Sequence, residues 1–283
     1  ADLRARGSAL VLRQGDSQAE LQALIAQTGA EAVYWNRKYE PATQPRDATI
    51  KRTLREQGID AQSCNGSLLF EPWDIATQQG QPYKVFTPYW RNVLSHWRLP
   101  ALQAAPQRLP AHAVHGLALD ALQLAPTLDW DTGFWEHWQP GEAGALEALS
   151  VFEDGALRGY REQRDLPDRV GTSRMSPHLH FGEIAPWRIA HALEGLRSAG
   201  TDADIDGYLR QLGWRDFAYH LLHHFPKTPN ENLNPRFDRF PWANPSSAQL
   251  HDWQRGNTGV PIVDAGLREL WHTGYMHNRV RMI

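Results

Sequence analysis

A change in the spacing of apolar residues along the chain places the strongest constraint on the fold. Up to about residue 65, short apolar runs alternate with amphipathic helical segments, whereas helical spacing dominates from Ala145 to the end. Strands that alternate with helices predict a parallel, doubly wound sheet. We therefore expect an α/β domain followed by an all-α domain, with no internal repeat.

The predicted α/β domain contains three strands and two helices. The strands are expected at residues 9–12, 32–35 and 59–64, and the helices at 18–27 and 45–57. Ligands bind beyond the carboxyl ends of parallel strands, so the loop Asn36–Glu40 is a candidate small-molecule site, with an ordinary polar loop as the alternative. Since three strands leave an exposed edge and residue 1 is not Met, we expect a first strand and helix to be missing.

The sequence is expected to divide into three parts. Residues 1–99 form the α/β domain, residues 100–144 a linker, and residues 145–283 the helical domain. Because the linker is rich in Ala, Pro and Leu and carries several Trp, it is too apolar for a disordered tether, and we expect it to pack over both domains. Helices of the last part are predicted at residues 147–160, 176–182, 185–198, 205–225 and 259–270, and from about residue 276 onward.

Composition excludes several classes of protein. No apolar run is long enough for a membrane-spanning helix, and the first residues carry no secretory signal pattern. Cys64 is the only cysteine, which excludes an intrachain disulfide and fits a cytoplasmic protein. The formal net charge of −3 gives no argument for nucleic-acid binding by the whole chain. In residues 151–283, however, 15 of the 16 Lys and Arg residues are Arg, which suits bidentate contacts to phosphate, so any basic groove would be local.

The segment Gly171–Pro186 has the features of an anion site. Its first residues include two hydroxyls and one guanidinium, and Ser176 followed by Pro177 is typical of a helix start with Ser at the N-cap. Free backbone N–H groups at such a position bind phosphate, and a diphosphate is the natural occupant. An ordinary cap with a surface Arg is the alternative.

The longest predicted helix has an unusual face. Tyr208, Gln211, Arg215 and Tyr219 recur at spacings of three and four. Such a face suits a wall that stacks on a planar ligand and forms hydrogen bonds to it. An amphipathic helix with its polar side in water is the alternative.

Near the end of the chain, Asn278 and Arg281 lie three residues apart. The Asn amide offers a donor and an acceptor to a base edge, and Arg279 and Arg281 could hold phosphates or a flavin.

The histidines do not indicate a metal. Neither His178 and His180 nor the group at residues 220–224 has an acidic or Cys partner at a recognised motif spacing. The sequence also lacks the Gly-x-Ser-x-Gly motif of hydrolases. We therefore expect neither a metal site nor a nucleophilic hydrolase.

Four motifs, in order and in register, resemble the cryptochrome/photolyase family. They are Gly171–Pro177, Gly213–Phe217, Trp253–Ala265 and Thr273–Met282. Further matches at residues 35–36, 84–88 and 138–142 extend the resemblance over essentially the whole chain. The Met-His-Asn-Arg motif is most similar to bacterial enzymes that repair cyclobutane pyrimidine dimers.

The resemblance implies a bent FAD in the helical domain and a set of residues for each role. The FAD site would include Tyr160, Thr172, Ser173, Arg174, Met175, Ser176, Tyr208, Gln211, Arg215, Asn278 and Arg281. Contacts to DNA would come from Arg164, Arg215, Tyr275 and Arg279, with Trp214 and Tyr275 flanking the flipped dimer. The catalytic set would be Asn278, Trp214, Gln211 and Trp242, with Trp242 as the outer member of an electron relay.

The implied activity is light-driven repair of pyrimidine dimers by electron transfer from reduced FAD, a carbon–carbon lyase reaction on damaged DNA. An antenna pigment, methenyltetrahydrofolate or a deazaflavin, would bind near Asn36–Glu40, and the protein would be a monomer. Gln211 stands where many dimer photolyases carry Glu. Compared with Glu, Gln keeps the shape of the side chain but loses its charge. Family members continue well beyond Ile283, so part of the flavin site is expected to be missing. The alternatives are a blue-light receptor and a fragment without flavin that is inactive or only binds DNA.

Overall fold

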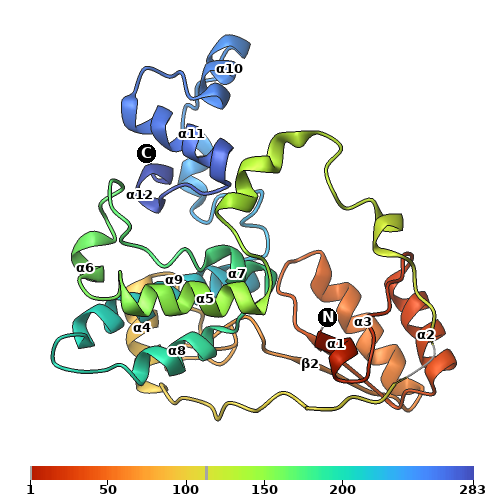
Figure 1. The fold of residues 1–283 in the computed structure, drawn as a ribbon. Helices are drawn as coiled ribbons and strands as arrows, with labels where there is room; N and C mark the ends of the chain where they lie inside the picture. Colours follow the sequence, from red (N-terminus) through yellow and green to blue (C-terminus); the bar gives the residue numbers. More distant parts are fainter. Residues whose placement is uncertain (1, 112–113) are drawn as a thin grey trace. The chain divides into compact units, whose positions relative to one another are not determined.

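A computed structural model describes residues 2–111 and 114–283 (Figure 1). The chain forms two compact units. The first consists of Ala1–Gly66 and Pro100–Thr127, and the second of Ser67–Leu99 and Leu128–Ile283. The segment predicted as a linker is therefore divided between the two units. Each unit has its own core.

The first unit is an α/β structure. Strands β1 (Ala32–Asn36) and β2 (Asp60–Cys64) are parallel, with Ala32 opposite Asp60. The helices are α1 (Asp2–Ala5), α2 (Ser17–Thr28) and α3 (Thr43–Glu56), with the short 3₁₀ helix η1 (Leu119–Leu122). Residues from α3 and β2 form the centre of its core: Ile50, Leu54 and Ala61. The order β1–α3–β2 confirms the predicted parallel α/β arrangement.

Local signals account for the bounds of α2. The Asp16 carboxylate accepts a hydrogen bond from the backbone N–H of Ala19 at 2.9 Å, which satisfies a free donor of the first turn. Gly29 ends the helix with φ 66°, a left-handed conformation that costs glycine little. The predicted helix at residues 18–27 is confirmed.

The strand predicted at residues 9–12 does not form. This segment is coil, and the sheet of the described residues contains only β1 and β2. Its backbone receives a hydrogen bond from Leu117 N to Leu12 O at 2.9 Å, but makes no ladder with either strand. An apolar run becomes a strand only where a neighbouring strand satisfies its backbone groups.

The second unit is helical, as predicted (Figure 1). Its helices are α4 (Phe86–Ser95), α5 (Glu142–Asp154), α6 (Tyr160–Gln163), α7 (Ser176–Phe181), α8 (Pro186–Glu194), α9 (Asp202–His224), α10 (Ser247–Arg255), α11 (Pro261–Thr273) and α12 (Asn278–Arg281), with the 3₁₀ helices η2 (Asp129–Glu136) and η3 (Pro235–Arg239). The long helix α9 packs against α4, α6 and α8 and lies at the centre of the core.

The helices expected from the sequence do not include α10, although the sequence carries a signal for it. The Ser246 hydroxyl accepts from the backbone N–H of Gln249, and the Gln249 side chain accepts from the backbone N–H of Ser246. This reciprocal capping box starts the helix, and Gly256 ends it with φ 63°.

Residues 67–99 belong with the helical unit, whereas sequence analysis placed them in the α/β domain. Phe86, Tyr89, Trp90 and Val93 of α4 are buried in the same core as α9. A Cβ at Gly213 of α9 would collide with the Trp90 ring, so this glycine allows the two helices to approach closely. The aromatic side chains of α4, which the sequence could not assign to a core, decide its position.

Two buried polar side chains attach α9 to the segment before α4. The Asp216 carboxylate accepts a hydrogen bond from the backbone N–H of Phe70 at 2.9 Å. His220 donates from Nδ1 to the carbonyl of Pro72 and accepts at Nε2 from the backbone N–H of Tyr83, each at 3.0 Å. Burial raises the pKa of Asp216 to about 7 and lowers the pKa of His220 to about 4. Both groups are therefore held toward their neutral forms.

We expect Asp216→Asn to make the unfolding free energy fall more steeply as the pH drops from 6.5 to 4. His220 is neutral in the fold but protonates below pH 6.5 when unfolded, so its contribution is lost as the pH falls. Asp216 acts oppositely, because its contribution is lost as the pH rises from about 4 to about 7. In the wild type, the two opposing pH-dependent contributions to the unfolding free energy partly cancel. Urea unfolding at several pH values compares the two slopes, and equal slopes would contradict this assignment.

Candidate functional site

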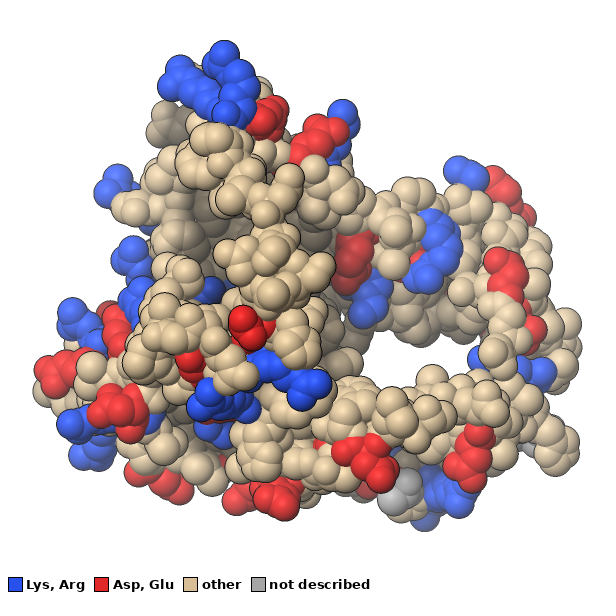
Figure 2. Space-filling model, turned by 90° about the horizontal axis from the view of Figure 1, so that it is seen from above, with Lys and Arg blue, Asp and Glu red and all other residues tan. Residues whose placement is uncertain are grey.

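A cavity of about 860 Å³ lies in the helical unit beside α9. It is lined by residues of α6, α9 and α12 and of the segment after α6: Tyr160, Arg161, Arg164, Asp165, Thr172, Gly207, Arg210, Gln211, Trp214, Arg215, Asn278, Arg279 and Met282. Five of these are arginines and one is a carboxylate. In the face shown in Figure 2, by contrast, positive and negative side chains are interspersed. The excess of positive charge in this cavity is therefore local, as the arginine-rich second half of the sequence predicts.

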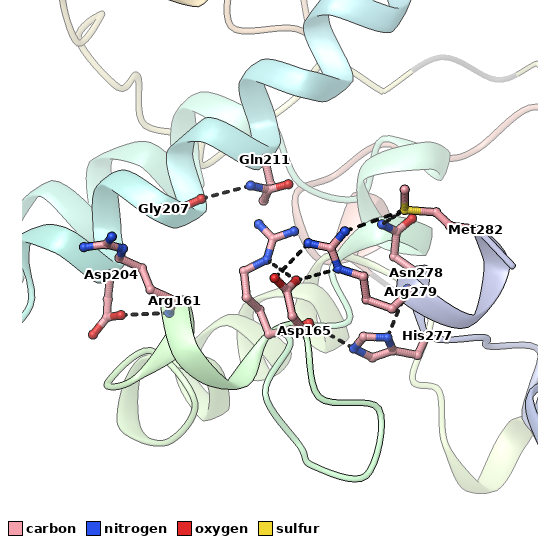
Figure 3. Close-up of polar contacts among 10 residues, drawn as sticks. Arg161, Asp165, Asp204, Gly207, Gln211, His277, Asn278, Arg279 and Met282 are labelled. Atoms are coloured by element: carbon pink, nitrogen blue, oxygen red, sulfur yellow. Dashed lines mark hydrogen bonds and ion pairs between the residues drawn. The ribbon is translucent and has the colours of Figure 1, made fainter. Parts of the chain in front are cut away.

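The cavity brings together eight of the residues that the resemblance implies. They are Tyr160, Arg164, Thr172, Gln211, Trp214, Arg215, Asn278 and Arg279. The polar contacts around this cluster are drawn in Figure 3. Residues that lie far apart in the sequence thus converge on one concave surface.

The wall formed by α9 is fixed by stacking and by backbone contacts. The Trp214 ring stacks on Phe86, with ring centroids 3.6 Å apart and planes inclined by 11°. The Gln211 side chain donates to the carbonyl of Gly207 at 3.2 Å. Phe86 is buried in the core, so Trp214 lies on a rigid support while its own ring remains partly exposed to the cavity.

Arg215 is held by main-chain carbonyls. Its Nη2 donates to Leu179 O at 3.3 Å and its Nη1 to Ser67 O. The guanidinium also lies over the Tyr219 ring, 5.1 Å from the centroid. Arg215 therefore joins three segments of the unit in addition to lining the cavity.

Asp165 contacts two of the cavity arginines (Figure 3). Arg279 donates from Nε to Asp165 Oδ1 at 2.9 Å, and its Nη2 lies 2.8 Å from Oδ2. Arg164 donates from Nε to Oδ1 at 3.0 Å. The hydrogen bond from Arg279 holds the pKa of Asp165 below its usual value, and the same contact raises the pKa of Arg279. Asp165 is thus a carboxylate at neutral pH.

Three further residues of the cavity are not among those expected from the sequence: Arg161, Asp165 and Arg210. An acidic residue directly after a candidate DNA contact is a weak signal, because adjacent opposite charges are common on protein surfaces. The contact that matters joins Asp165 to Arg279 across 114 residues, which no local pattern reveals.

A second cavity, of about 480 Å³, is lined in part by Thr172, Ser173 and Arg174. The Ser173 hydroxyl lies 2.9 Å from the hydroxyl of Tyr208, and burial raises the pKa of Tyr208. The Thr172 hydroxyl lies 3.1 Å from the hydroxyl of Tyr275. The segment predicted to hold a diphosphate therefore presents its side chains to two cavities, with Thr172 in both.

The helix predicted from residue 176 begins there, but the predicted N-cap at Ser176 is wrong. Ser176 is the first helical residue, and the N-cap is Met175, which makes no side-chain cap. The turn begins earlier because Arg174 is left-handed, with φ 53°, and the Ser173 hydroxyl accepts from Met175 N at 3.3 Å. Met175 is buried in the core. The predicted Pro in the first turn is present, but Ser176 does not cap the helix.

Four other predicted residues do not line the large cavity. Tyr208 is buried in the core, and Tyr275 lies under the Arg174 guanidinium, 4.7 Å from it. Arg281 is exposed at the end of α12. Trp242 is 75% exposed and contacts only the Phe240 ring among the described aromatic contacts, with centroids 4.6 Å apart.

The histidines that were considered as metal ligands make structural contacts. His178 Nδ1 lies 2.6 Å from Glu183 Oε2, and His220 and His224 both donate to the carbonyl of Pro72. In residues 2–111 and 114–283, no three His, Cys, Asp or Glu side chains are arranged to hold a metal ion. A search of the same residues finds no helix with the length and apolar character needed to cross a membrane.

Comparisons with known proteins match both parts of the chain. The family model described as DNA photolyase matches residues 1–111, and that described as the FAD binding domain of DNA photolyase matches residues 208–283. A deoxyribodipyrimidine photo-lyase of Agrobacterium fabrum is 44% identical, over 99% of this chain and 59% of that protein. Cryptochrome-2 of Arabidopsis thaliana is 33% identical, over 99% of this chain and 48% of that protein.

A solved photolyase structure has the same fold as this chain. The crystal structure of a bacterial class III photolyase from Agrobacterium tumefaciens superposes with a TM-score of 0.94 at 44% identity, over 99% of this chain and 59% of that one. The chain thus spans 59% of the length of this photolyase. Sequence motifs, family models and fold agree, and the chain belongs to the cryptochrome/photolyase family.

Proposed function

We propose that the protein containing this chain binds FAD and repairs cyclobutane pyrimidine dimers in DNA when illuminated. The observation that carries the proposal is the 860 Å³ cavity with five arginines, Trp214, Gln211 and Asn278. Support comes from the match of residues 208–283 to an FAD binding domain and from relatives named deoxyribodipyrimidine photo-lyase.

The residues present fit a large, anionic, planar group. Ligand cavities typically measure about 300–1,000 Å³, and this one lies near the upper end. Its arginines suit phosphates, and its amides can hydrogen-bond to a ring edge. Thr172, Ser173 and Arg174 are proposed to hold the diphosphate of FAD, and Tyr160, Gln211 and Asn278 the remainder.

The chain's own residues would orient the lesion and exclude water. The chemistry supplied by bound, reduced FAD is light-driven donation of one electron to the dimer and its recovery once the ring has split. A dimer is poorly stacked and paired, which lowers the cost of extruding it from the duplex. Trp214 is proposed to stack against the extruded dimer, while Arg164 and Arg279 contact phosphates. Binding should therefore weaken as salt rises.

Two further assignments accompany this proposal. The protein is proposed to be a cytoplasmic monomer, and an antenna pigment is proposed at the loop Asn36–Glu40, which follows β1 at its carboxyl end. A blue-light receptor without repair activity is the second candidate, favoured by the similarity to plant cryptochromes. The concentration of arginines in the cavity favours repair, since signalling does not require phosphate contacts.

The proposal predicts that Asn278→Ala in the full-length protein keeps its flavin but loses most of its repair. Asn278 lines the cavity with an exposed amide, and its described side-chain contact is a weak one to Met282 Sδ at 3.6 Å. Its removal should therefore cost little stability. The measurement is the visible flavin spectrum together with light-dependent repair of a dimer-containing oligonucleotide. A colourless wild type would contradict FAD binding, and normal repair by the variant would contradict the role of Asn278.

A further inference from the structure

Asp165 is placed between two arginines that come from different parts of the chain. One carboxylate oxygen accepts from both Arg164 Nε, at 3.0 Å, and Arg279 Nε, at 2.9 Å, and the other lies 2.8 Å from Arg279 Nη2. Two guanidinium charges thus share one carboxylate, which leaves the cluster with a net charge of +1.

The cluster keeps hydrogen-bond donors for a ligand. Arg164 contacts Asp165 through Nε alone, so its two terminal nitrogens remain free of hydrogen bonds within the described chain. Arg279 uses its third nitrogen, Nη1, only for a long contact to Met282 Sδ at 3.8 Å. All three side chains line the large cavity. A net charge of +1 with free donors on two guanidinium groups matches a single phosphodiester.

His277 ties the same two segments together through the backbone (Figure 3). Its Nδ1 accepts from the backbone N–H of Arg279 at 3.2 Å and caps α12, and its Nε2 donates to the carbonyl of Arg164 at 3.0 Å. Because His277 is buried, this link is protected from water. The backbones of both arginines are therefore fixed by His277, and their guanidinium groups by Asp165.

Stability does not explain why a carboxylate lies here. The side chains of Asp165 and Arg279 are 43% and 42% exposed, and exposed ion pairs contribute roughly 0–1 kcal/mol. A carboxylate in a cavity for DNA also repels phosphate. What it adds is orientation: it restricts two flexible guanidinium groups to one arrangement before a ligand arrives.

We propose that Asp165 is a positioning residue that presents Arg164 and Arg279 as a paired receptor for one phosphodiester beside the extruded lesion. The proposal rests on the proposed function, because it assigns the ligand as DNA. It goes beyond that function by giving an acidic residue a part in recognising damage.

The test is Asp165→Asn in the full-length protein. The amide keeps the size of the side chain and one acceptor but loses the charge that holds both arginines. The matched control is Asp168→Asn, which lies in the same loop, is 76% exposed and pairs with Arg169 at 3.9 Å. Affinities for duplexes with and without a single dimer are measured over a range of salt concentrations, together with flavin content.

We expect Asp165→Asn to reduce the preference for damaged over undamaged DNA about tenfold. Affinity for undamaged DNA should hold or rise, and its salt dependence steepen, because a negative charge has been removed. The control Asp168→Asn should leave both the preference for damaged DNA and the affinity for undamaged DNA unchanged. If the affinity for both duplexes rose equally, Asp165 would act only as a charge that repels DNA. If both affinities fell equally and flavin was lost, its role would be purely structural. Either result overturns the proposal.

A second probe separates this proposal from the proposed function. If the wild type does not prefer damaged DNA, the proposed function fails, and thymidylyl-thymidine, which carries one phosphodiester, then tests the receptor alone. Weaker binding of this dinucleotide by Asp165→Asn than by the wild type would support the paired receptor. Equal binding would overturn it.

Discussion

Replacing Phe86 by Ala should cost the helical unit about 3–5 kcal/mol of unfolding free energy. Phe86 is 3% exposed and lies between two tryptophans, stacked on Trp214 at 3.6 Å and parallel to Trp90 at 6.1 Å between ring centroids. Its loss opens a void that neither indole can fill without moving. Chemical denaturation, monitored by circular dichroism, measures this loss as a lower midpoint concentration of denaturant.

The matched control for this substitution is Phe181→Ala. Phe181 is the last residue of α7 and is 74% exposed, so its removal should change the unfolding free energy by no more than about 0.5 kcal/mol. Equal effects at the two positions would mean that the stack of Trp214, Phe86 and Trp90 does not organise this core.

Replacing Trp214 by Ala should weaken binding of dimer-containing DNA by about 10- to 100-fold, because stacking an aromatic side chain on a base contributes about 1–3 kcal/mol. The ring lines the large cavity, is held by Phe86 beneath it and leaves 45% of its surface exposed for a ligand. Binding of undamaged DNA should be nearly unchanged, since an intact duplex offers no extruded base. Titration with labelled duplexes measures the affinity of each variant for damaged and for undamaged DNA.

Trp253→Ala is the control for Trp214. Trp253 lies on α10 with a similar exposure, 51%, but does not line this cavity. The variant Trp214→Phe should recover part of the affinity, because it keeps an aromatic face. If Trp253→Ala and Trp214→Ala were equally harmful, or if damaged and undamaged DNA were affected alike, the lesion would not stack on Trp214.

Local signals in the sequence were sufficient to predict most helices. Asp16 and Gly29 mark the ends of α2, and the apolar spacing of residues 205–225 closely anticipates α9. The prediction of a strand at residues 9–12 was wrong, because the formation of a strand depends on a partner elsewhere in the chain. The prediction of an N-cap at Ser176 was wrong, because Arg174 adopts a left-handed conformation that a non-glycine residue rarely takes.

The membership of the cavity was more predictable than its internal contacts. Motifs pointed to Tyr160, Gln211, Trp214 and Asn278, and the structure places all four on its surface. The support of Trp214 by Phe86 and the contact of Asp165 with Arg279 could not be predicted, because each joins residues far apart in the sequence. Pairing of this kind depends on the packing of whole helices.

Light-dependent repair of a defined lesion is the decisive measurement for the proposed function. The purified full-length protein is mixed with an oligonucleotide that contains one cyclobutane dimer, under reducing conditions, and half of the sample is kept dark. We expect restored thymines only in the illuminated half, at a rate that falls in the Trp214→Ala variant. An illuminated protein that carries FAD but leaves the dimer intact would contradict the account and indicate a light receptor.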